Sequence, residues 1–302
     1  MYTKIAAILE QLNSILLGKE QQTKLALVCL LADGHLLIED LPGMGKTTLA
    51  SALAKTLGLS HQRVQFTSDM LPADILGVSI FDNQLQNFSF HEGPVFTQIL
   101  LADEINRASP KTQSALLEAM AERKVTIDKN TYPLDDSFFV IATQNPQDQA
   151  GTFPLPESQL DRFMMRIELG FPNKEAELSM LKGQGNKQTI NAIVDSQELL
   201  AMQAEVQKVE ANDTLLDYLI RLVSESRHSS HFANALSPRC SKELLNAAKA
   251  MAFMARRHYV VPEDIQAVFA AVTDHRLNGV DGLKHSNQAL SQTLLNSVDP
   301  LL

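Results

Sequence analysis

A short glycine-containing segment offers the clearest chemistry in this sequence. Gly43, Gly45, Lys46 and Thr47 follow an apolar run at 36–38 and precede a stretch with helical periodicity. Glycines let backbone N–H groups turn around an anion, and the N-terminus of the following helix adds partial positive charge. Lys46 could then reach the β- and γ-phosphates of a nucleotide, while the Thr47 hydroxyl could hold Mg²⁺. The segment therefore predicts a phosphate-binding loop.

Asp40 is a departure of this segment from the usual phosphate-loop pattern. The pattern G-x-x-x-x-G-K-[ST] begins with glycine at the position where Asp40 stands, although Lys46 and Thr47 are both in place. Short motifs also match by chance. An exposed lysine on an ordinary strand-to-helix turn is therefore the alternative interpretation.

Two acidic residues follow a second apolar run. Asp103 and Glu104 come directly after residues 99–102, whose continuous apolar character is typical of a strand buried on both faces. In phosphate-loop enzymes an acid at this point holds Mg²⁺, and a second acid can accept a proton from the attacking water. A solvated loop is the alternative, but an upstream phosphate-binding loop makes it the weaker one.

Three further residues stand where they could act on a nucleotide. Asn145 follows the apolar run at 138–142 and could orient the attacking water, although Asn-Pro also initiates ordinary turns. Arg162 could stabilise the charge on a phosphoryl group bound to a neighbouring subunit. Arg239 lies in the first turn of a predicted helix, where a cation is slightly unfavourable. That cost favours contact with phosphate over a purely structural role.

Alternating strands and helices up to about residue 172 predict the scaffold for these residues. Ser109 and Pro110 are typical of a helix N-terminus, as cap and first residue. This order of elements predicts an α/β layered fold with a mainly parallel sheet. The predicted strands are 36–38, 64–66, 99–102, 138–142 and 166–169, and the predicted helix after the loop is 47–57.

The pattern changes after Phe171-Pro172-Asn173, where only helical periodicity remains. We therefore predict a nucleotide-binding core at residues 1–172 and a smaller helical domain at 173–302. The clearest helices of the second part are 215–223, 241–257 and 262–272, and the tail from Leu277 is weakly patterned.

Two polar turns inside the core are flanked by alternating apolar and polar residues. They lie at Val78–Phe90 and Val125–Pro133 and predict β-hairpins. The N-terminal residues 4–33 have helical spacing, with a break around 15–20.

Charge and composition narrow the possible partners and locations. The formal net charge is −9, which argues against nucleic acid as the main partner. Cys29 and Cys240 are far apart, and we expect buried free thiols in a reducing cytoplasm. The longest apolar candidate, Leu25–Ala32, is too short to span a bilayer, and the N-terminus lacks the apolar region of a secretory signal.

Together these segments resemble the MoxR family of AAA+ ATPases over nearly the whole chain. The resemblance implies a P-loop αβα sandwich followed by a small all-helical lid. It also implies binding of ATP and Mg²⁺. The matching segments are His35–Thr48, Gln65–Gly77, Gly93–Phe96, Leu101–Ala108, Ala142–Pro146 and Leu155–Phe163.

The resemblance also implies roles for individual residues. Asp103 would be the acid associated with Mg²⁺, and Glu104 the catalytic base. Asn145 would be the first sensor of the nucleotide and Arg239 the second, reporting nucleotide state to the lid. Arg162 would be the arginine finger acting on the neighbour's nucleotide. The rivals for the finger are Arg107, Arg123 and Arg166. The other residues expected at the nucleotide are Pro42, Gly43, Met44, Gly45, Lys46, Thr47, Thr48 and, near adenine, Gly18 with residues 15–17.

Members of this family generally form rings, usually hexamers, with nucleotide between subunits. They are thought to remodel or activate partner proteins, often ones with a von Willebrand factor A domain, and such a partner could be membrane-bound. An ATPase that inserts a metal or cofactor into one enzyme is the alternative. A nucleic-acid motor is disfavoured by the acidic charge. A nucleotide-gated scaffold without turnover is disfavoured by the intact set of Lys46, Asp103, Glu104 and Arg162.

Overall fold

The computed structural model describes the chain except residues 84–85, 146–150, 184–188, 230–231, 279–286 and 301–302 and the side chains of 287–289. The strands are β1 (Leu36–Glu39), β2 (His61–Gln65), β3 (Gly77–Asp82), β4 (Asn87–Glu92), β5 (Ile99–Asp103), β6 (Lys124–Ile127), β7 (Asn130–Pro133), β8 (Phe139–Gln144) and β9 (Met165–Ile167). The helices are α1 (Tyr2–Ile15), α2 (Glu20–Leu31), α3 (Lys46–Thr56), α4 (Pro72–Leu76), α5 (Pro110–Glu122), α6 (Glu157–Leu160), α7 (Lys174–Leu181), α8 (Ser196–Gln207), α9 (Asp213–His228), α10 (Pro238–Met254), α11 (Pro262–Thr273) and α12 (Asn287–Ser297).

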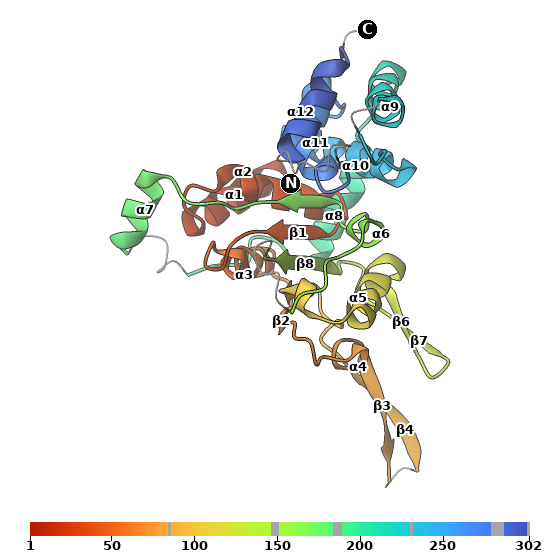
Figure 1. Cartoon of the computed structure of the whole chain (residues 1–302). Coiled ribbons are helices and arrows are strands. Elements are labelled where there is room, and N and C mark those ends of the chain that lie inside the picture. The colour runs from red at the N-terminus through yellow and green to blue at the C-terminus, as the bar shows by residue number, and fades with distance from the viewer. Residues whose placement is uncertain (84–85, 146–150, 184–188, 230–231, 279–286, 301–302) are drawn as a thin grey trace.

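The centre of the molecule is a parallel five-stranded sheet in the order β2-β5-β8-β1-β9. Alternate residues of each central strand belong to different apolar clusters. On β1, Leu36 and Ile38 pack in the cluster that includes α1, α2 and α3, whereas Leu37 packs in the cluster that includes α5. This alternation places helices on both faces and gives the predicted αβα sandwich (Figure 1).

The parallel topology decides where the candidate residues lie. The carboxyl ends of β1, β5 and β8 share one edge of the sheet, and the amino ends share the opposite edge. The phosphate-binding loop follows β1, and Glu104 and Asn145 follow β5 and β8. Ligands of open α/β sheets bind at this carboxyl edge.

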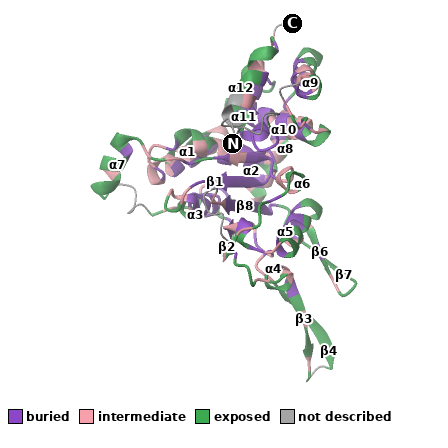
Figure 2. Ribbon diagram, in the orientation of Figure 1, coloured by how far each residue is buried: buried purple, intermediate pink, exposed green. Residues whose placement is uncertain are grey.

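Two hairpins, β3–β4 and β6–β7, extend from the core, and both were predicted. The pair β3–β4 projects away from the sheet and is exposed over much of its length (Figures 1 and 2). Phe81 and Phe88 contact each other edge to face on it at a centroid distance of 5.2 Å, and both are exposed. Phe90 stacks on Tyr132 of β7 at 4.1 Å, so the two hairpins contact each other near their bases.

The residues after 172 fold into helices α7 to α12, in line with the predicted all-helical lid. Helix α10 packs against α2 of the core and against α8, α9 and α11 of the lid. Ser237 caps α10 by accepting a hydrogen bond from the Cys240 amide, with Pro238 as the first helical residue. One apolar cluster runs from α1–α3 into α10 and α11. The proposed division at 172/173 therefore falls within a continuous core and stays a prediction.

Several local predictions differ from the structure in detail. The last strand of the sheet is Met165–Ile167, which begins one residue and ends two residues before the predicted 166–169. Helices α7, α8 and α12 lack a pattern strong enough to predict. Cys29 and Cys240 are free and buried, as predicted. Among the described residues, no helix is long and apolar enough to cross a membrane.

Candidate active site

The loop after β1 has the backbone geometry that phosphate binding requires. Gly43 and Gly45 have φ of +84° and +97°, a region that favours glycine, and Gly45 caps α3. Lys46 begins the helix, and its ammonium donates to the carbonyl oxygens of Asp40 at 2.8 Å and Gln144 at 3.5 Å. Burial lowers the pKa of Lys46, while the carboxylates of Asp103, Asp40 and Glu104 act in the opposite direction. A buried ammonium held by carbonyls is suited to an anionic ligand.

Asp40 occupies the place of the first glycine because its side chain fixes the loop. One carboxylate oxygen accepts from the Leu41 amide at 2.8 Å, and the other accepts from the Gly170 amide at 2.6 Å. The ammonium of Lys19 donates to the carbonyls of Leu169 and Gly170, both at 2.7 Å. Asp40 thus ties the start of the loop to the segment that leads from β9 into the lid. Lys46 and Thr47 keep their places.

A cavity of about 330 Å³ lies against the loop at the carboxyl edge of the sheet. It brings together residues from the loop, from β2 and from the end of β5, which lie far apart in the sequence. Its lining residues are Pro42, Gly43, Gly45, Lys46, Thr47, Thr48, Arg63, Gln65, Asp103 and Glu104. The cavity therefore contains a lysine, two hydroxyls and two carboxylates, which are the groups that phosphate-loop enzymes use to bind a nucleoside triphosphate and promote its hydrolysis.

Asp103 is held in place by two side chains that the sequence motifs did not single out. The Thr143 hydroxyl donates to Asp103 Oδ1 at 2.6 Å. Arg63 of β2 donates to Oδ2 through Nη2 at 2.7 Å and through Nε at 3.2 Å. The aspartate is only 7% exposed, and these partners fix the orientation of its carboxylate.

Glu104 has a left-handed backbone conformation directly after Asp103. Its φ is +57°, and its amide donates to the Thr143 hydroxyl at 2.9 Å. The Glu104 carboxylate pairs with Arg107 Nε at 3.0 Å. A non-glycine residue in this conformation is strained, and such residues concentrate at functional sites.

The residues present fit a nucleotide with Mg²⁺. Carboxylate and hydroxyl oxygens are the ligands that Mg²⁺ prefers, and Asp103 and Thr47 line the same cavity. The side-chain amide nitrogen of Gln144 is buried, and within the described part of the chain it has no acceptor. Asn145 directly follows Gln144 at the end of β8, as predicted.

A second cavity, of about 300 Å³, adjoins the loop on its other side. It is mostly apolar and shares Gly43, Gly45 and Thr48 with the first cavity, as expected for a base next to a phosphate site. Its other lining residues are Ile15, Leu16, Leu17, Lys19, Met44, Pro172 and Met180.

Gly18 does not line this second cavity, although residues on both sides of it do. Its φ is +71°, and an added Cβ would lie 2.9 Å from the Ala176 Cβ. The structure thus gives Gly18 a packing role against the start of α7, and its place near adenine stays a prediction.

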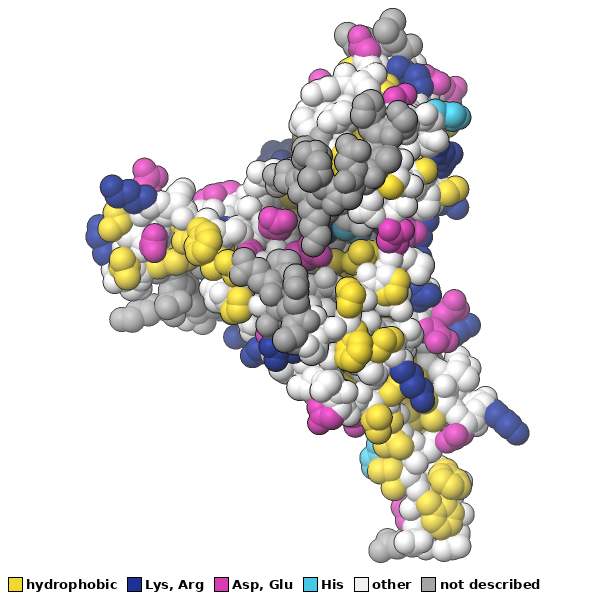
Figure 3. Space-filling view, in the orientation of Figure 1, with side chains coloured by type: hydrophobic (Ala, Val, Ile, Leu, Met, Phe, Trp, Pro, Cys, Tyr) yellow, Lys and Arg dark blue, Asp and Glu magenta, His cyan; other side chains and the backbone are white. Residues whose placement is uncertain are grey.

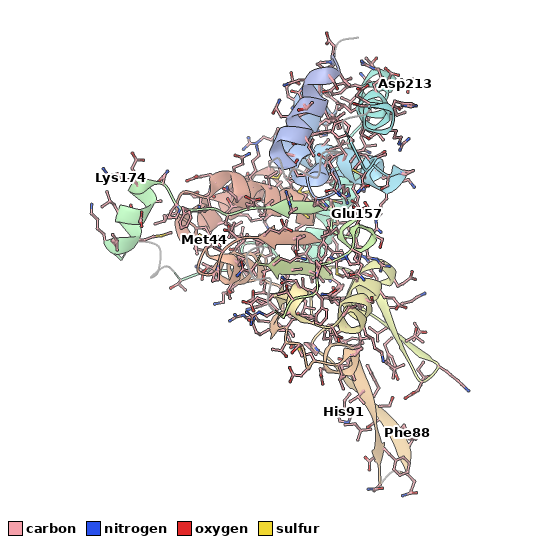
Figure 4. All side chains as sticks on the ribbon, in the orientation of Figure 1. Met44, Phe88, His91, Glu157, Lys174 and Asp213 are labelled. Carbon is pink, nitrogen blue, oxygen red and sulfur yellow. The ribbon has the colours of Figure 1, made fainter. Side chains whose placement is uncertain are left out.

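Arg162 and Arg239 lie together, at the edge of the sheet opposite the loop. Both line a cavity of about 280 Å³ that also includes Gly34 and His35, the residues just before β1. Arg162 Nη1 donates to the Leu117 carbonyl at 2.6 Å, and Arg239 Nε pairs with Glu243 at 3.1 Å. Figure 4 shows the two ends of the core, with Met44 of the loop at one and Glu157 of α6 at the other.

The rival arginines have different surroundings. Arg123 lines the cavity of Arg162 and pairs with Asp33. Arg107 pairs with Glu104 at the loop edge, and Arg166 pairs with Glu39 between β9 and β1 at 2.8 Å. Of the three, only Arg123 shares the cavity of Arg162 and Arg239.

Arg276 is a third residue that sequence reasoning missed. Its buried guanidinium joins Asp161, which precedes Arg162, to Glu243, which holds Arg239. It stands between the end of α11 and the weakly patterned tail from Leu277, where nothing in the sequence distinguishes it from a surface arginine.

Comparison with known proteins places this arrangement in a family. Residues 35–165 match the ATPase family associated with various cellular activities (AAA), and residues 224–294 match the AAA lid domain. The protein YeaC of Bacillus subtilis (strain 168) is 43% identical over 280 residues, which are 92% of this chain and 88% of that protein. Chaperone MoxR1 of Mycobacterium tuberculosis is 38% identical over 287 residues, 92% of this chain and 76% of that protein.

Two further proteins agree with these matches. Protein MoxR of Paracoccus denitrificans is 29% identical over 95% of this chain and 92% of its own length. A solved structure from Cytophaga hutchinsonii, assigned as an ATPase, has a TM-score of 0.90 and 37% identity over 99% of this chain and 95% of that one. The chain therefore belongs to the MoxR family of AAA+ ATPases, which are ATP-hydrolysing enzymes.

Proposed function

We propose that this chain assembles into a hexameric ring and hydrolyses ATP at sites formed between neighbouring subunits. The observation that carries the proposal is the separation of the two sets of candidate residues. The loop, Asp103 and Glu104 share one edge of the sheet, whereas Arg162 and Arg239 line a cavity at the opposite edge. One chain cannot bring both edges to one phosphate, but two chains in a ring can.

The loop edge supplies the groups that bind ATP and activate water. Lys46 and the loop amides hold the phosphates, and Thr47 and Asp103 hold Mg²⁺, which supplies charge neutralisation when bound. Glu104 accepts the proton of the attacking water, since its carboxylate lines the cavity and its strained backbone fixes its position. Asn145 follows the neighbouring strand and orients that water.

The opposite edge supplies the positive charge that stabilises the transferring phosphoryl group of the neighbour. Arg162 is the arginine finger, a role worth about 10³–10⁵ in rate. Arg239 lies in the same cavity, so it senses the neighbour's nucleotide from the lid rather than the nucleotide of its own loop. Arg123 is the remaining rival because it shares that cavity.

We further propose that the ATPase cycle serves a chaperone-like remodelling of partner proteins with a von Willebrand factor A domain. The relative MoxR1 is named a chaperone, which supports the coarser part of this proposal. The β3–β4 hairpin supports it as well, because it presents exposed Val78, Ile80, Phe81 and Phe88 away from the core (Figure 3). Exposed apolar patches on soluble proteins commonly mark contacts with partners.

Ring formation and partner binding can be tested with two variants. Glu104→Gln should bind ATP without turnover, and size-exclusion chromatography with ATP should show a ring. Tagged Glu104→Gln with ATP should then capture a von Willebrand factor A protein that Lys46→Ala does not capture. Full activity from a confirmed monomer would overturn the ring. Capture of a metalloenzyme or of nucleic acid instead would overturn the proposed partner.

A further inference from the structure

Arg276 lies at the junction between the core and the lid, just after α11. Among the described residues it is the only buried arginine, and its side chain is 5% exposed. From the core it contacts Asp161 Oδ1 at 2.7 Å, the Phe163 carbonyl at 2.9 Å and the Met164 carbonyl at 3.2 Å. From the lid it pairs with Glu243 of α10. All three of its nitrogens donate, so the guanidinium is held from several directions.

The charges around Arg276 form a connected chain. Asp161 and Glu243 are the two carboxylates on its guanidinium, and Arg239 adds a second cation on Glu243 at 3.1 Å. Burial raises the pKa of Glu243, while Arg276 and Arg239 lower it. A buried carboxylate between two guanidinium groups is fixed in position, because movement would leave a charge unpaired.

Both ends of this chain lead to the arginines of the proposed intersubunit site. Asp161 is the residue before Arg162, and Glu243 holds Arg239 directly. Arg162 and Arg239 line one cavity. Arg276 contacts both supports, Asp161 from the core and Glu243 from the lid.

We propose that Arg276 is a positioning residue that sets Arg162 and Arg239 as one unit facing the neighbour's nucleotide. This inference rests on the proposed intersubunit site. Arg276 does not reach nucleotide itself. Its effect is to hold Asp161 and Glu243 at a fixed separation, so that the finger and the sensor approach the same phosphate together.

A mixed-ring experiment tests this proposal. Arg276→Lys keeps the positive charge but loses the planar guanidinium whose N–H groups bridge Asp161 and Glu243. Small errors in the position of a catalytic group can cost about 10²-fold in rate, so we expect kcat to fall by about that factor while binding of a fluorescent ATP analogue stays unchanged. Mixing this variant with Lys46→Ala should restore hydrolysis, because intact loops then face intact arginines.

Two controls separate positioning from loss of stability. Arg257→Lys alters a bidentate pair with Asp264 elsewhere in the lid and should leave kcat unchanged. Asp161→Asn removes only one ion pair and should behave as Arg276→Lys does in mixing, even if the arginine variant folds poorly. Both are checked by thermal unfolding followed by circular dichroism.

The outcomes distinguish this inference from the proposed function. One outcome is that Lys46→Ala restores hydrolysis to Arg162→Ala but to neither Arg276→Lys nor Asp161→Asn. In that case Arg276 only stabilises the fold, and the inference fails. If Arg162→Ala is not rescued either, the intersubunit site itself is wrong. Weaker nucleotide binding by Arg276→Lys in isolation would also contradict a role confined to the neighbour's site.

Discussion

The two edges of the central sheet are built in different ways. The loop edge gathers residues that directly follow three parallel strands, so strand order alone brings Lys46, Asp103 and Asn145 together. The arginine edge joins the segment around Arg162 to two lid segments that contain Arg239 and Arg276. One edge follows from local sequence and parallel topology, and the other depends on how the lid packs. A variant can therefore damage one edge and leave the other intact.

The largest effect is expected from Lys46→Ala, which removes the lysine of the phosphate-binding loop. Its ammonium donates to the carbonyls of Asp40 and Gln144 and is the charge that we propose faces the phosphates. Binding of a fluorescent ATP analogue should fall below detection, and hydrolysis with it. Lys55→Ala, which changes an exposed lysine in the last turn of the same helix, is the matched control. Retained tight binding by Lys46→Ala would remove the phosphate-loop assignment.

Arg162→Ala should lower kcat by about 10³-fold or more while leaving ATP binding intact, since an arginine finger acts only on the transition state. The comparison of the edges is sharpest in mixtures. Arg162→Ala mixed with Glu104→Gln should recover activity, because some interfaces then pair an intact loop edge with an intact arginine edge. Glu104→Gln mixed with Lys46→Ala should not. Steady-state phosphate release measures both.

Recovery in the second mixture, or its absence in the first, would show that the edges do not act across subunits. Normal hydrolysis by Arg162→Ala rings alone would instead transfer the finger role to Arg123, the rival that shares the cavity.

Thr143→Val should produce a smaller loss, of about tenfold in kcat. The hydroxyl donates to Asp103 Oδ1 and accepts from the Glu104 amide, so its removal takes this partner from both groups at a cost of about 1–3 kcal/mol, while Arg63 still holds Oδ2. A titration of activity against Mg²⁺ should show a weaker apparent affinity for the metal. Thr126→Val on the exposed β6–β7 hairpin is the control. An unchanged Mg²⁺ dependence would mean that Thr143 only stabilises the fold.

The same contrast explains what the sequence could and could not predict. Continuous apolar strands, the glycine-lysine-threonine loop and polar turns between alternating residues are local signals, and they located the sheet, the loop edge and both hairpins. Thr143 lies inside a predicted strand and Arg63 on a short one, and their importance depends on strands that pair only in space. Arg276 had no signal at all, because its partners lie 33 and 115 positions away. The sequence showed Asp40 only as a departure from the phosphate-loop pattern, because its hydrogen-bond partner, the Gly170 amide, is distant in the sequence.

The smallest effect concerns pH and belongs to the arginine edge. His35 is buried there, accepting from the Val140 amide at 3.1 Å, and burial with the nearby charge of Arg123 lowers its pKa from 6.5 to about 4. As pH falls through 6.5, His35 binds a proton in the unfolded chain but stays neutral in the folded chain. Stability should thus fall between pH 7 and pH 6, by roughly 0.7 kcal/mol from this residue.

Urea denaturation at the two pH values measures this loss. His35→Gln should flatten the dependence, whereas His91→Asn, which changes an exposed ring of the β3–β4 hairpin, should leave it unchanged. Burial also lowers the pKa of His275, so this residue adds to the loss of stability on acidification for the same reason. Both histidines flank the arginine edge, so loss of stability on acidification should begin where the lid meets the core. Hydrogen exchange at pH 6 that shows faster opening at the loop edge instead would contradict this difference between the edges.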